Sequence, residues 1–455
     1  MNLVVGLGLT GQSVMRYLVS MDEPMLALDT RADFDLSPLE SQFAEVNFAA
    51  GSLPKSWKKN ITRIVLSPGI ARSEPWIREL EEQGIEVIGD IELFARAASQ
   101  PIISITGSNG KSTVTTLTAE FLAQAGYQVG MGGNIGCPAL DLLLDEKDYD
   151  VYVLELSSFQ LETTYSLHSA SSVVLNISED HMDRYPSLDA YLQAKLKIYD
   201  DTELAVIPYA ERSESWVSTK TKKTGFDLTP PRTPKDYGII EIDHQAWLAL
   251  GEKPLVKLAD MRLNAPHSQL NALAAMALCQ DFDIAPSVFS QVLEGFNGLA
   301  HRTQRVVEHQ GVRWIDDSKG TNVGATLTAI HSLGQQAQQQ EGKLILLLGG
   351  VGKEADFSPL APAINQYVKQ VVLFGRDQTL ICQAIAPALR LAIKLDCVDN
   401  LQQAIAISKQ GAKPGDVVLF SPACASFDQF ANYHDRGEKF NLWVHQALGI
   451  ACASV

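Results

Sequence analysis

Short apolar runs alternate with stretches of helical periodicity through most of the 455-residue sequence. In the first section, four runs have the length and the Val, Ile and Leu content of buried strands: NLVVGLG, MLALDT, RIVLSPG and GIEVIG. Strands separated by helices predict a parallel sheet with helices on both faces. We therefore expect the first section to be an α/β domain.

A second section begins near QPIISITG. After Lys111, apolar residues recur on one face of a predicted helix, namely Val114, Leu117, Phe121, Leu122 and Ala125. The runs VYVLEL and SVVLNI that follow are apolar enough for strands buried on both faces. Residues 225–261 change to short segments broken by turns, which predicts a small antiparallel sheet.

The third section starts around GLAHRTQRV and again alternates strands and helices, with the strands KLILLLGG, QVVLFG and DVVLFSPA. The chain is therefore predicted to be α/β in three domains, at residues 1–92, 93–298 and 299–455. We expect a Rossmann-like first domain, a central parallel sheet of the P-loop ATPase type with the small antiparallel sheet, and a Rossmann-like last domain.

Composition narrows the classes of partner. A net charge of −16 argues against nucleic acid as the main partner, because phosphate backbones are bound by clustered Lys and Arg. No apolar run approaches the roughly 20 residues of a membrane span, and nothing resembling a secretory leader precedes the first strand. The six cysteines form no C-x-x-C pair, which favours reduced thiols without a zinc or disulfide role. We expect a soluble, cytoplasmic protein.

The first candidate motif for ligand binding is GLGLTG. Gly6, Gly8 and Gly11 follow a predicted strand in the spacing G-x-G-x-x-G, and Asp29 ends the next strand. Such glycines let the backbone approach a pyrophosphate at a helix N-terminus, while the acid takes a ribose hydroxyl. The motif fits a dinucleotide site, but it fits equally a tight turn that binds another nucleotide, such as a UDP-sugar, or nothing.

A second motif, TGSNGKST, lies between a predicted strand and a predicted helix. It lacks the first glycine of a full Walker A loop, because Ile105 stands there. The loop from Gly107 to Ser112 still offers a nest of N–H groups, a lysine for the terminal phosphates and a hydroxyl for Mg²⁺. We interpret it as a nucleotide triphosphate site, since a plain glycine turn leaves Lys-Ser-Thr at the helix start unexplained.

Several polar residues follow predicted strands and could join this loop. Glu155 is placed to help hold Mg²⁺, and His181 leaves the end of another strand, fourteen residues before Lys195. Taken alone, His181 fits a hydrogen-bonding residue and Lys195 a surface lysine. Because ligands gather beyond the carboxyl ends of strands in open α/β sheets, we expect Lys111, Ser112, Glu155 and His181 to share one crevice.

The third section adds three anion-binding loops after strands: WIDDSKGTN, LLGGVGKEADF and LFSPACASFDQF. They carry Asp317, Lys319, Thr321, Asn322, Lys353, Ser426 and Phe427. Any one of them fits a loop with capping residues, but three in one domain favour an anionic ligand.

Together these motifs resemble a known family. TGSNGKST, GGNIG, LELSSFQLE, EDHMDRYP, AHRTQRV, DDSKGTN, LLGGVGK and SPACASFDQF, in this order, are similar to the motifs of the Mur ligases of peptidoglycan synthesis. The resemblance covers essentially the whole chain. It implies ATP-dependent ligation of D-glutamate to UDP-N-acetylmuramoyl-L-alanine through an acyl phosphate, with Mg²⁺, in a cytoplasmic enzyme that we expect to be a monomer.

The resemblance also implies roles for individual residues. The UDP substrate would meet Leu9, Thr10, Asp29, Thr30, Arg31, Ser67, Gly69, Asn134 and His181. ATP would meet Gly107, Ser108, Asn109, Gly110, Lys111, Ser112, Thr113, Asn271, Arg302, Asp317 and Lys319. Mg²⁺ would be held by Ser112, Glu155, His181 and Lys195, and D-glutamate by Thr321, Lys353, Ser426 and Phe427. The implied catalytic residues are Lys111, Glu155, His181 and Lys195.

Lys195 is implied to be carbamylated, which would turn a cation into a carboxylate-like Mg²⁺ ligand. Two departures from the family pattern stand out: Ser268 replaces the Asn that usually follows a His, and Asp316 replaces a neutral residue. We expect a hinge between the second and third domains, near residues 297–299, whose closure would exclude water from the acyl phosphate.

Three alternatives remain open. The chain could add another amino acid or build folylpolyglutamate, although the D-N-P-R motif expected of a diaminopimelate-adding ligase is absent from the third section. The GLGLTG motif with Asp29 alone would fit a nicotinamide-dependent oxidoreductase. A nucleotide-binding regulator without chemistry is the third alternative.

Overall fold

The computed structural model describes residues 1–211 and 213–450. By contacts the chain divides into two compact units. Unit 1 comprises Met1–Ile177 and Asp189–Phe296, and unit 2 comprises Ser178–Leu188 with Asn297 onward. Each unit is described by itself below.

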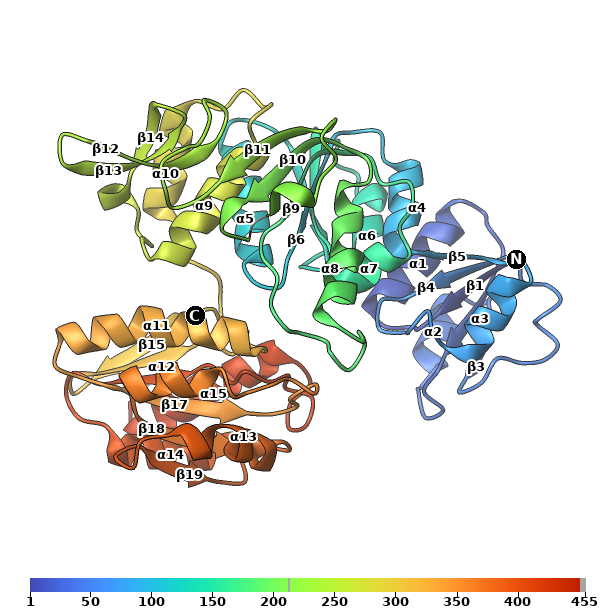
Figure 1. Cartoon of the computed structure of the whole chain (residues 1–455). Helices are drawn as coiled ribbons and strands as arrows, with labels where there is room; N and C mark the ends of the chain where they lie inside the picture. Colours follow the sequence, from blue (N-terminus) through green and yellow to red (C-terminus); the bar gives the residue numbers. More distant parts are fainter. Residues whose placement is uncertain (212, 451–455) are drawn as a thin grey trace. The chain divides into compact units, whose positions relative to one another are not determined.

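Unit 1 begins with a five-stranded parallel sheet of order β3-β2-β1-β4-β5 (Figure 1). Its strands are β1 (Asn2–Val5), β2 (Met25–Asp29), β3 (Asn47–Ala50), β4 (Arg63–Leu66) and β5 (Glu86–Gly89), and its helices are α1 (Leu9–Ser20), α2 (Ser37–Gln42), α3 (Pro75–Glu82) and α4 (Asp90–Ala97). Alternate residues of β1 enter two apolar cores, Leu3 on one face and Val4 on the other. Both faces are covered, as the unbroken apolar runs predicted.

The second sheet of unit 1 has nine strands, in the order β14-β13-β12-β11-β10-β9-β6-β8-β7. They are β6 (Ile102–Thr106), β7 (Val129–Gly133), β8 (Val151–Glu155), β9 (Ser169–Val174), β10 (Thr202–Pro208), β11 (Lys222–Phe226), β12 (Tyr237–Ile242), β13 (Gln245–Leu250) and β14 (Lys253–Lys257). The helices are α5 (Lys111–Gln124), α6 (Ala139–Leu144), α7 (Ser158–Glu162), α8 (Leu188–Leu196), α9 (Pro266–Leu278) and α10 (Pro286–Gly295). The predicted helix after Lys111 is confirmed, and its residues Val114, Leu117, Phe121 and Leu122 are buried.

The antiparallel strands predicted within residues 225–261 are present as β12, β13 and β14. We expected these strands to form a small sheet of their own, and they do not. Instead β12 joins β11 in parallel through the single pair Phe226 and Tyr237, so the antiparallel strands extend the central sheet. Such a connection depends on one long-range pairing, which the local sequence pattern does not encode.

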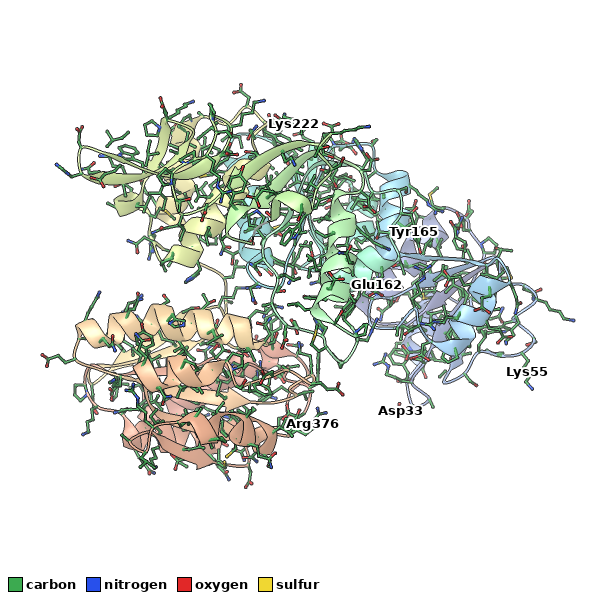
Figure 2. The ribbon with its side chains drawn as sticks, in the orientation of Figure 1. Asp33, Lys55, Glu162, Tyr165, Lys222 and Arg376 are labelled. Carbon is green, nitrogen blue, oxygen red and sulfur yellow. The ribbon has the colours of Figure 1, made fainter. Side chains whose placement is uncertain are left out.

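Side chains between the two sheets tie unit 1 together. Arg16 on α1 forms a two-pronged ion pair with Asp141 on α6, with Nη2 to Oδ2 at 2.6 Å. Arg72 donates to the Glu162 carbonyl at 3.3 Å and lies over the Tyr165 ring; Glu162 and Tyr165 are labelled in Figure 2. One apolar core also includes residues from both sheets. The five-stranded sheet is therefore packed directly against the helices of the nine-stranded sheet.

Unit 2 contains a six-stranded sheet of order β15-β16-β20-β17-β18-β19, in which only β15 and β16 are antiparallel. The strands are β15 (Gln304–His309), β16 (Val312–Asp316), β17 (Leu344–Gly349), β18 (Val368–Phe374), β19 (Lys394–Cys397) and β20 (Val417–Phe420). The helices are α11 (Val323–Gln339), α12 (Leu360–Tyr367), α13 (Gln378–Ile385), α14 (Leu401–Gly411) and α15 (Tyr433–Leu448). Leu346 and Leu347 of β17 enter opposite apolar cores, as in the first sheet.

Three α/β sheets in sequence confirm the predicted fold class. The predicted domain boundaries at residues 92 and 298 stay predictions. Within the described residues, none of the helices combines the length and the apolar character that crossing a bilayer would demand.

Candidate functional site

The glycine loop between β6 and α5 has the conformation that its sequence predicted. Gly107 and Gly110 have φ angles of +150° and +84°, which L side chains rarely adopt. A Cβ atom at Gly110 would also lie 2.7 Å from Oδ1 of Asn271, so that side chain packs against the loop. Lys111 Nζ donates to the carbonyls of Gly107 and Ser108 at 2.8 and 2.9 Å. The loop therefore keeps a lysine folded over its own backbone at the start of a helix.

Asn176, just after β9, latches this loop in place. Its carbonyl accepts from Ser108 N at 3.0 Å, and its Oδ1 accepts from Asn109 N at 2.9 Å. Its Nδ2 donates to the Asn109 carbonyl at 2.9 Å. Our sequence interpretation missed Asn176; the only signal was an amide residue where the apolar run SVVLNI breaks.

The end of β8 places a buried acid beside the loop. Glu155 is 1% exposed, and its Oε2 accepts from Ser112 Oγ at 2.6 Å. Its Oε1 accepts from Asn134 Nδ2 at 2.8 Å. Both oxygens of this buried carboxylate therefore have hydrogen-bond donors, and both donors are neutral. A buried carboxylate with neutral partners is suited to a cation, because buried charges are usually paired or coordinate metals.

This arrangement fits a Mg²⁺ ion in the predicted position. Ser112 and Glu155 offer a hydroxyl and a carboxylate oxygen, which are hard ligands that Mg²⁺ prefers together with phosphate oxygens. Within residues 1–211 and 213–450 there is no group of three His, Cys, Asp or Glu side chains that could hold a metal by itself. A Mg²⁺ ion bound here would take its other ligands from phosphate oxygens and water.

Lys195, at the end of α8, is not the surface lysine that it would be in isolation. It is 1% exposed, and its Nζ donates to the Gly107 carbonyl at 2.9 Å and to Thr106 Oγ1 at 3.3 Å. The same Nζ lies 4.6 Å from the centre of the Tyr191 ring. Two distant segments of the chain thus bring Lys111 and Lys195 to the same carbonyl of one loop.

The GLGLTG turn in the first sheet is equally well defined. A Cβ atom at Gly11 would lie 1.9 Å from the Gly6 carbonyl oxygen, so the turn requires glycine there. Ser67 Oγ donates to that same oxygen at 2.6 Å. Leu9 opens α1 and is 78% exposed, which leaves the start of this helix accessible.

Asp29 does not have the free carboxylate that a ribose contact would need. Its Oδ2 accepts from Leu7 N and Arg31 Nη2, both at 2.9 Å, and its Oδ1 accepts from Arg31 N and Nε. Burial raises the pKa of Asp29, but the hydrogen bonds and the charge of Arg31 outweigh it, and the pKa is lowered overall. The ionised acid therefore fixes Arg31 beside the glycine turn.

In unit 2, Lys353 forms an ion pair with Asp180. Asn322, which caps α11, donates to the same carboxylate at 3.2 Å. Burial raises the pKa of Asp180, but the charges of Lys353 and His181 outweigh it and lower the pKa to about 2. Asp180 therefore binds both Lys353 and Asn322, which come from two of the predicted anion-binding loops.

Asp317 is buried in unit 2 and accepts hydrogen bonds through both of its carboxylate oxygens. Its Oδ2 accepts from Ser421 Oγ at 2.6 Å, and its Oδ1 accepts from Thr303 N at 3.0 Å. Burial raises the pKa of Asp317 to about 6, although these bonds and the charge of Arg302 work in the opposite direction. Lys319 lies 3.9 Å from the centre of the Tyr433 ring, a contact that the sequence did not suggest.

Arg436 on α15 is a second residue that our sequence interpretation missed. Its side chain is fully buried, and it donates to Ser318 Oγ, to the Ser318 carbonyl and to the Cys424 carbonyl, at 3.0, 2.7 and 3.0 Å. It thereby joins the loop of Lys319 to the loop that carries Ser426. In the latter loop Ser426 is 2% exposed and Phe427 is 73% exposed.

The predicted site residues fall into three groups, of which the first lies around the GLGLTG turn and includes Asp29, Arg31 and Ser67. In unit 1 the structure brings together Lys111, Ser112, Asn134, Glu155, Lys195 and Asn271. In unit 2 it brings Asn322 and Lys353 to Asp180, and Thr303 to Asp317, while His181 lies in the segment Ser178–Leu188 that belongs to that unit. A crevice shared by Glu155 and His181 remains a prediction, as do the individual ligand contacts.

Three family models match consecutive parts of the chain. They are described as a Mur ligase MurD-like N-terminal domain at residues 1–89, a Mur ligase middle domain at residues 105–279 and a Mur ligase glutamate ligase domain at residues 301–424. Together they cover most of the sequence.

Two relatives are similar over nearly their whole length. A UDP-N-acetylmuramoylalanine--D-glutamate ligase of Hydrogenovibrio crunogenus is 56% identical over 98% of this chain and 98% of its own. A protein of the same name from Alcanivorax borkumensis is 43% identical over 96% of each chain.

Solved structures show the same fold at much lower identity. The UDP-N-acetylmuramate-alanine ligase of Thermotoga maritima has a TM-score of 0.60 and 18% identity, covering 98% of this chain and 99% of its own. The MurF ligase of Thermotoga maritima, solved in complex with ADP, has a TM-score of 0.62 and 16% identity over 98% and 95% of the two chains. With three domain models in order and full-length relatives well above 30% identity, the chain belongs to the Mur ligase family.

Proposed function

We propose that the chain joins the amine of D-glutamate to the alanine carboxyl of UDP-N-acetylmuramoyl-L-alanine and uses ATP to do so. The observation that carries this proposal is the hydrogen bond from Ser112 to buried Glu155, at the mouth of a lysine-bearing phosphate loop. The arrangement occurs in a chain 56% identical to a ligase of that name. We also propose that the protein acts in the cytoplasm as a monomer.

The phosphate loop binds ATP in this proposal. Backbone N–H groups of residues 107–112 and the Lys111 ammonium receive the phosphates, and Asn176 keeps the loop in shape. Asn271 approaches the nucleotide from α9, and Arg302, Asp317 and Lys319 are the contributions of unit 2. One Mg²⁺ ion would be held by Ser112 and Glu155, and a second near His181 and Lys195. When bound, these ions neutralise negative charge on the phosphates.

The reaction follows from the weakness of a carboxylate as an electrophile. An oxygen of the alanine carboxylate attacks the γ-phosphorus of ATP, ADP leaves, and an acyl phosphate forms. The D-glutamate amine then attacks the acyl carbon and loses a proton, and inorganic phosphate departs as the amide forms. Lys111 supplies positive charge where negative charge gathers, and His181 is a candidate to stabilise the oxyanion.

The GLGLTG turn would receive the UDP part of the substrate. We assign Leu9, Thr10, Asp29, Thr30, Arg31, Ser67, Gly69 and Asn134 to this substrate. Asp29 is already bonded to Arg31 through both oxygens, so the turn presents a cation and not a free acid. A cation beside a helix start suits a pyrophosphate, which UDP-sugars and nicotinamide dinucleotides share. The 56% identity to a ligase named for a UDP substrate favours the UDP substrate here.

D-Glutamate would bind to unit 2 at Thr321, Lys353, Ser426 and Phe427. Lys353 already has a carboxylate partner in Asp180. A substrate carboxylate would therefore share this lysine with Asp180 or take it over. In this proposal the role of the Lys353 charge, which is paired with Asp180, is to bind a carboxylate of D-glutamate.

Carbamylation of Lys195 forms part of the proposal. The Nζ atom donates to oxygen acceptors at the phosphate loop. After loss of its proton, addition of CO₂ would turn it into a carbamate, an anionic group that would serve as a Mg²⁺ ligand. Growth or incubation with ¹³C-bicarbonate should then give a carbamate carbonyl signal in the wild type. The signal should be absent from Lys195→Met, and its absence from the wild type would remove this part of the proposal.

Phosphate release from ATP tests the main proposal. We expect release only when UDP-N-acetylmuramoyl-L-alanine and D-glutamate are both present, with L-glutamate and other amino acids inactive. Lys111→Met should abolish it, whereas Lys55→Met, which changes an exposed lysine in the loop between β3 and β4, should not. Release that follows a folate substrate or another amino acid would identify a different amide ligase, and a change in NADH absorbance would revive the oxidoreductase.

A further inference from the structure

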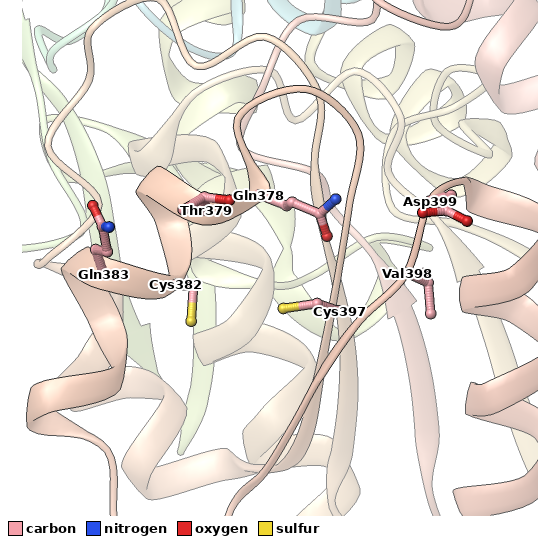
Figure 3. A pocket seen from close by; sticks show the side chains of 7 residues that line it. All are labelled: Gln378, Thr379, Cys382, Gln383, Cys397, Val398 and Asp399. Atoms are coloured by element: carbon pink, nitrogen blue, oxygen red, sulfur yellow. The ribbon is translucent and has the colours of Figure 1, made fainter.

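Unit 2 has an open surface pocket with a volume of about 390 Å³, and none of its lining residues belongs to the loops described above. It lies between the first turns of α13 and the end of β19 (Figure 3). Two of its lining residues are Cys382, on α13, and Cys397, the last residue of β19. The proposed ligase chemistry uses neither residue.

The two thiols lie close together. Figure 3 shows the sulfur atom of Cys397 pointing across the pocket toward that of Cys382. Both cysteines are free, with Cys397 exposed and Cys382 partly buried. Burial raises the pKa of the Cys397 thiol, and the nearby Cys382 raises it further through its charge and a hydrogen bond. The Cys382 sulfur is therefore close enough to that of Cys397 to affect the ionisation of Cys397, and solvent reaches the pair.

Both cysteines stand on fixed elements. Cys397 pairs with Leu373 of β18, and the next residue, Val398, donates its N–H to the Leu373 carbonyl at 2.9 Å. Cys382 lies in the middle of α13, which also carries the buried core residues Ile381 and Ile385. The sulfurs would therefore come together by rotation about side-chain bonds and by a shift of α13 against β19, not by movement of a loop.

We propose that Cys382 and Cys397 form a reversible disulfide when the protein meets a low-molecular-weight disulfide. In the first step one cysteine, as its thiolate, attacks a sulfur of the reagent, forms a mixed disulfide and releases one reagent thiolate. The second cysteine, as its thiolate, attacks the protein sulfur of that mixed disulfide and releases the second reagent thiolate. Two protein thiols are oxidised, one reagent disulfide is reduced to two thiols, and the protons pass from the cysteines to the released thiolates.

The start of α13 connects this pair to the loops of unit 2. Asp377, just before α13, accepts from Gly352 N at 2.7 Å, next to Lys353. Arg376 N donates to Asp428 Oδ2 at 3.0 Å, beside Phe427. A bond between Cys382 and Cys397 would pull α13 toward β19 and shift these two anchors. This consequence rests on the proposed function, because it predicts weaker binding of D-glutamate.

Treatment of the full chain with oxidised glutathione tests the disulfide without any activity assay. We expect the loss of two titratable thiols, a mass lower by two hydrogens and a proteolytic fragment that links Cys382 to Cys397, all reversed by dithiothreitol. Cys382→Ser and Cys397→Ser should each stop at one bound glutathione, whereas Cys137→Ser should still form the disulfide. Free thiols at both positions after treatment, or a fragment that links other cysteines, would overturn the proposal.

A second reagent does not depend on variants. Phenylarsine oxide binds tightly only where two thiols can reach one arsenic atom, so the untreated wild type should bind one equivalent and the glutathione-oxidised protein none. Failure of the reduced wild type to bind it would also count against a close pair of thiols.

The kinetic consequence is measured separately. Oxidation should raise the KM for D-glutamate several-fold and leave the KM for ATP unchanged. If the fragment linking Cys382 to Cys397 forms but the KM for D-glutamate does not change, the proposed disulfide stands. Only its proposed effect on Lys353 is then overturned. A protein that forms the disulfide but never ligates D-glutamate would instead remove the proposed function.

Discussion

His301 and Asp316 form a buried pair in unit 2, with Nδ1 of the histidine 2.7 Å from Oδ2 of the acid. The same oxygen accepts from Asn441 Nδ2 at 3.0 Å, and Oδ1 accepts from Ser318 N at 2.9 Å. Asp316, one of the two departures from the family pattern, is thus fully engaged. It holds a strained turn, because His301 and Thr303 both have left-handed backbones, with φ of 60° and 47°.

Removal of the Asp316 carboxylate should destabilise unit 2. In Asp316→Ala, His301, Ser318 and Asn441 lose their acceptor inside the core, and we expect a loss of roughly 2 to 4 kcal/mol in the free energy of unfolding. Asp316→Asn should lose less, because an amide oxygen still accepts. Urea unfolding measures both, with Asp356→Ala as a control for an exposed acid of the same unit. Equal stability of Asp316→Ala and the wild type would show that the turn needs no support.

Asp317 should make the stability of unit 2 depend on pH in an unusual direction. Its pKa is about 6 in the folded chain because of burial, above the ordinary value of 3.8. The folded state therefore binds a proton before the unfolded state as pH falls. The resulting stabilisation is fully present below the ordinary pKa and is lost as pH rises through about 6, a difference of roughly 3 kcal/mol.

The variant Asp317→Asn should remove this pH dependence. Urea unfolding between about pH 4 and about pH 7 would show wild type and variant diverging as pH rises, with the wild type losing stability relative to the variant. Asp90→Asn in unit 1 should diverge from the wild type in the same direction, because burial also raises the pKa of Asp90 to about 6. A constant difference between Asp317→Asn and the wild type at every pH would contradict the prediction.

Glu155→Gln should remove the negative charge beside the phosphate loop and keep the size and hydrogen bonding of the side chain. The glutamine can still accept from Ser112 or Asn134, so we expect the fold to be kept. The lost negative charge should raise the Mg²⁺ concentration needed for half-maximal phosphate release and lower kcat on the order of 100-fold. Glu120→Gln, on the exposed side of α5, should change neither value. An unchanged Mg²⁺ dependence in Glu155→Gln would exclude this acid as a ligand.

The features that could be predicted from the sequence are those that depend on residues close together in the chain. Apolar runs identified the three sheets, and the glycine loop identified the group around Lys111, since positive φ angles and strand ends are local properties. The sequence could not predict contacts that depend on distant partners. Asn176 gains its role from the Asn109 backbone, and the free acid expected at Asp29 is taken by Arg31.

The burial of Arg436 shows the same limit. In the sequence it lies in the charged stretch HDRGEK, which is typical of an exposed helix face. Its partners Ser318 and Cys424 come from two other loops, so its environment exists only after unit 2 has folded. The next residue, Gly437, allows α15 to pack closely against His301, since a Cβ atom at this position would lie 2.2 Å from Nδ1 of His301.

Arg436 should therefore be a residue on which the stability of unit 2 depends. Burial lowers the pKa of Arg436 to about 10, so the side chain is still charged at neutral pH. Arg436→Met leaves the Ser318 and Cys424 carbonyls without their donor and should cost roughly 2 to 4 kcal/mol in the free energy of unfolding.

Arg436→Lys tests whether charge alone is enough. One ammonium group cannot reproduce the planar fork that reaches Ser318 Oγ, the Ser318 carbonyl and the Cys424 carbonyl together, so we expect Lys to recover only part of the loss. Arg390→Met, at an exposed arginine of unit 2, should leave the urea midpoint unchanged. Full stability of Arg436→Lys would mean that the buried charge, and not the geometry of the guanidinium, joins the two loops.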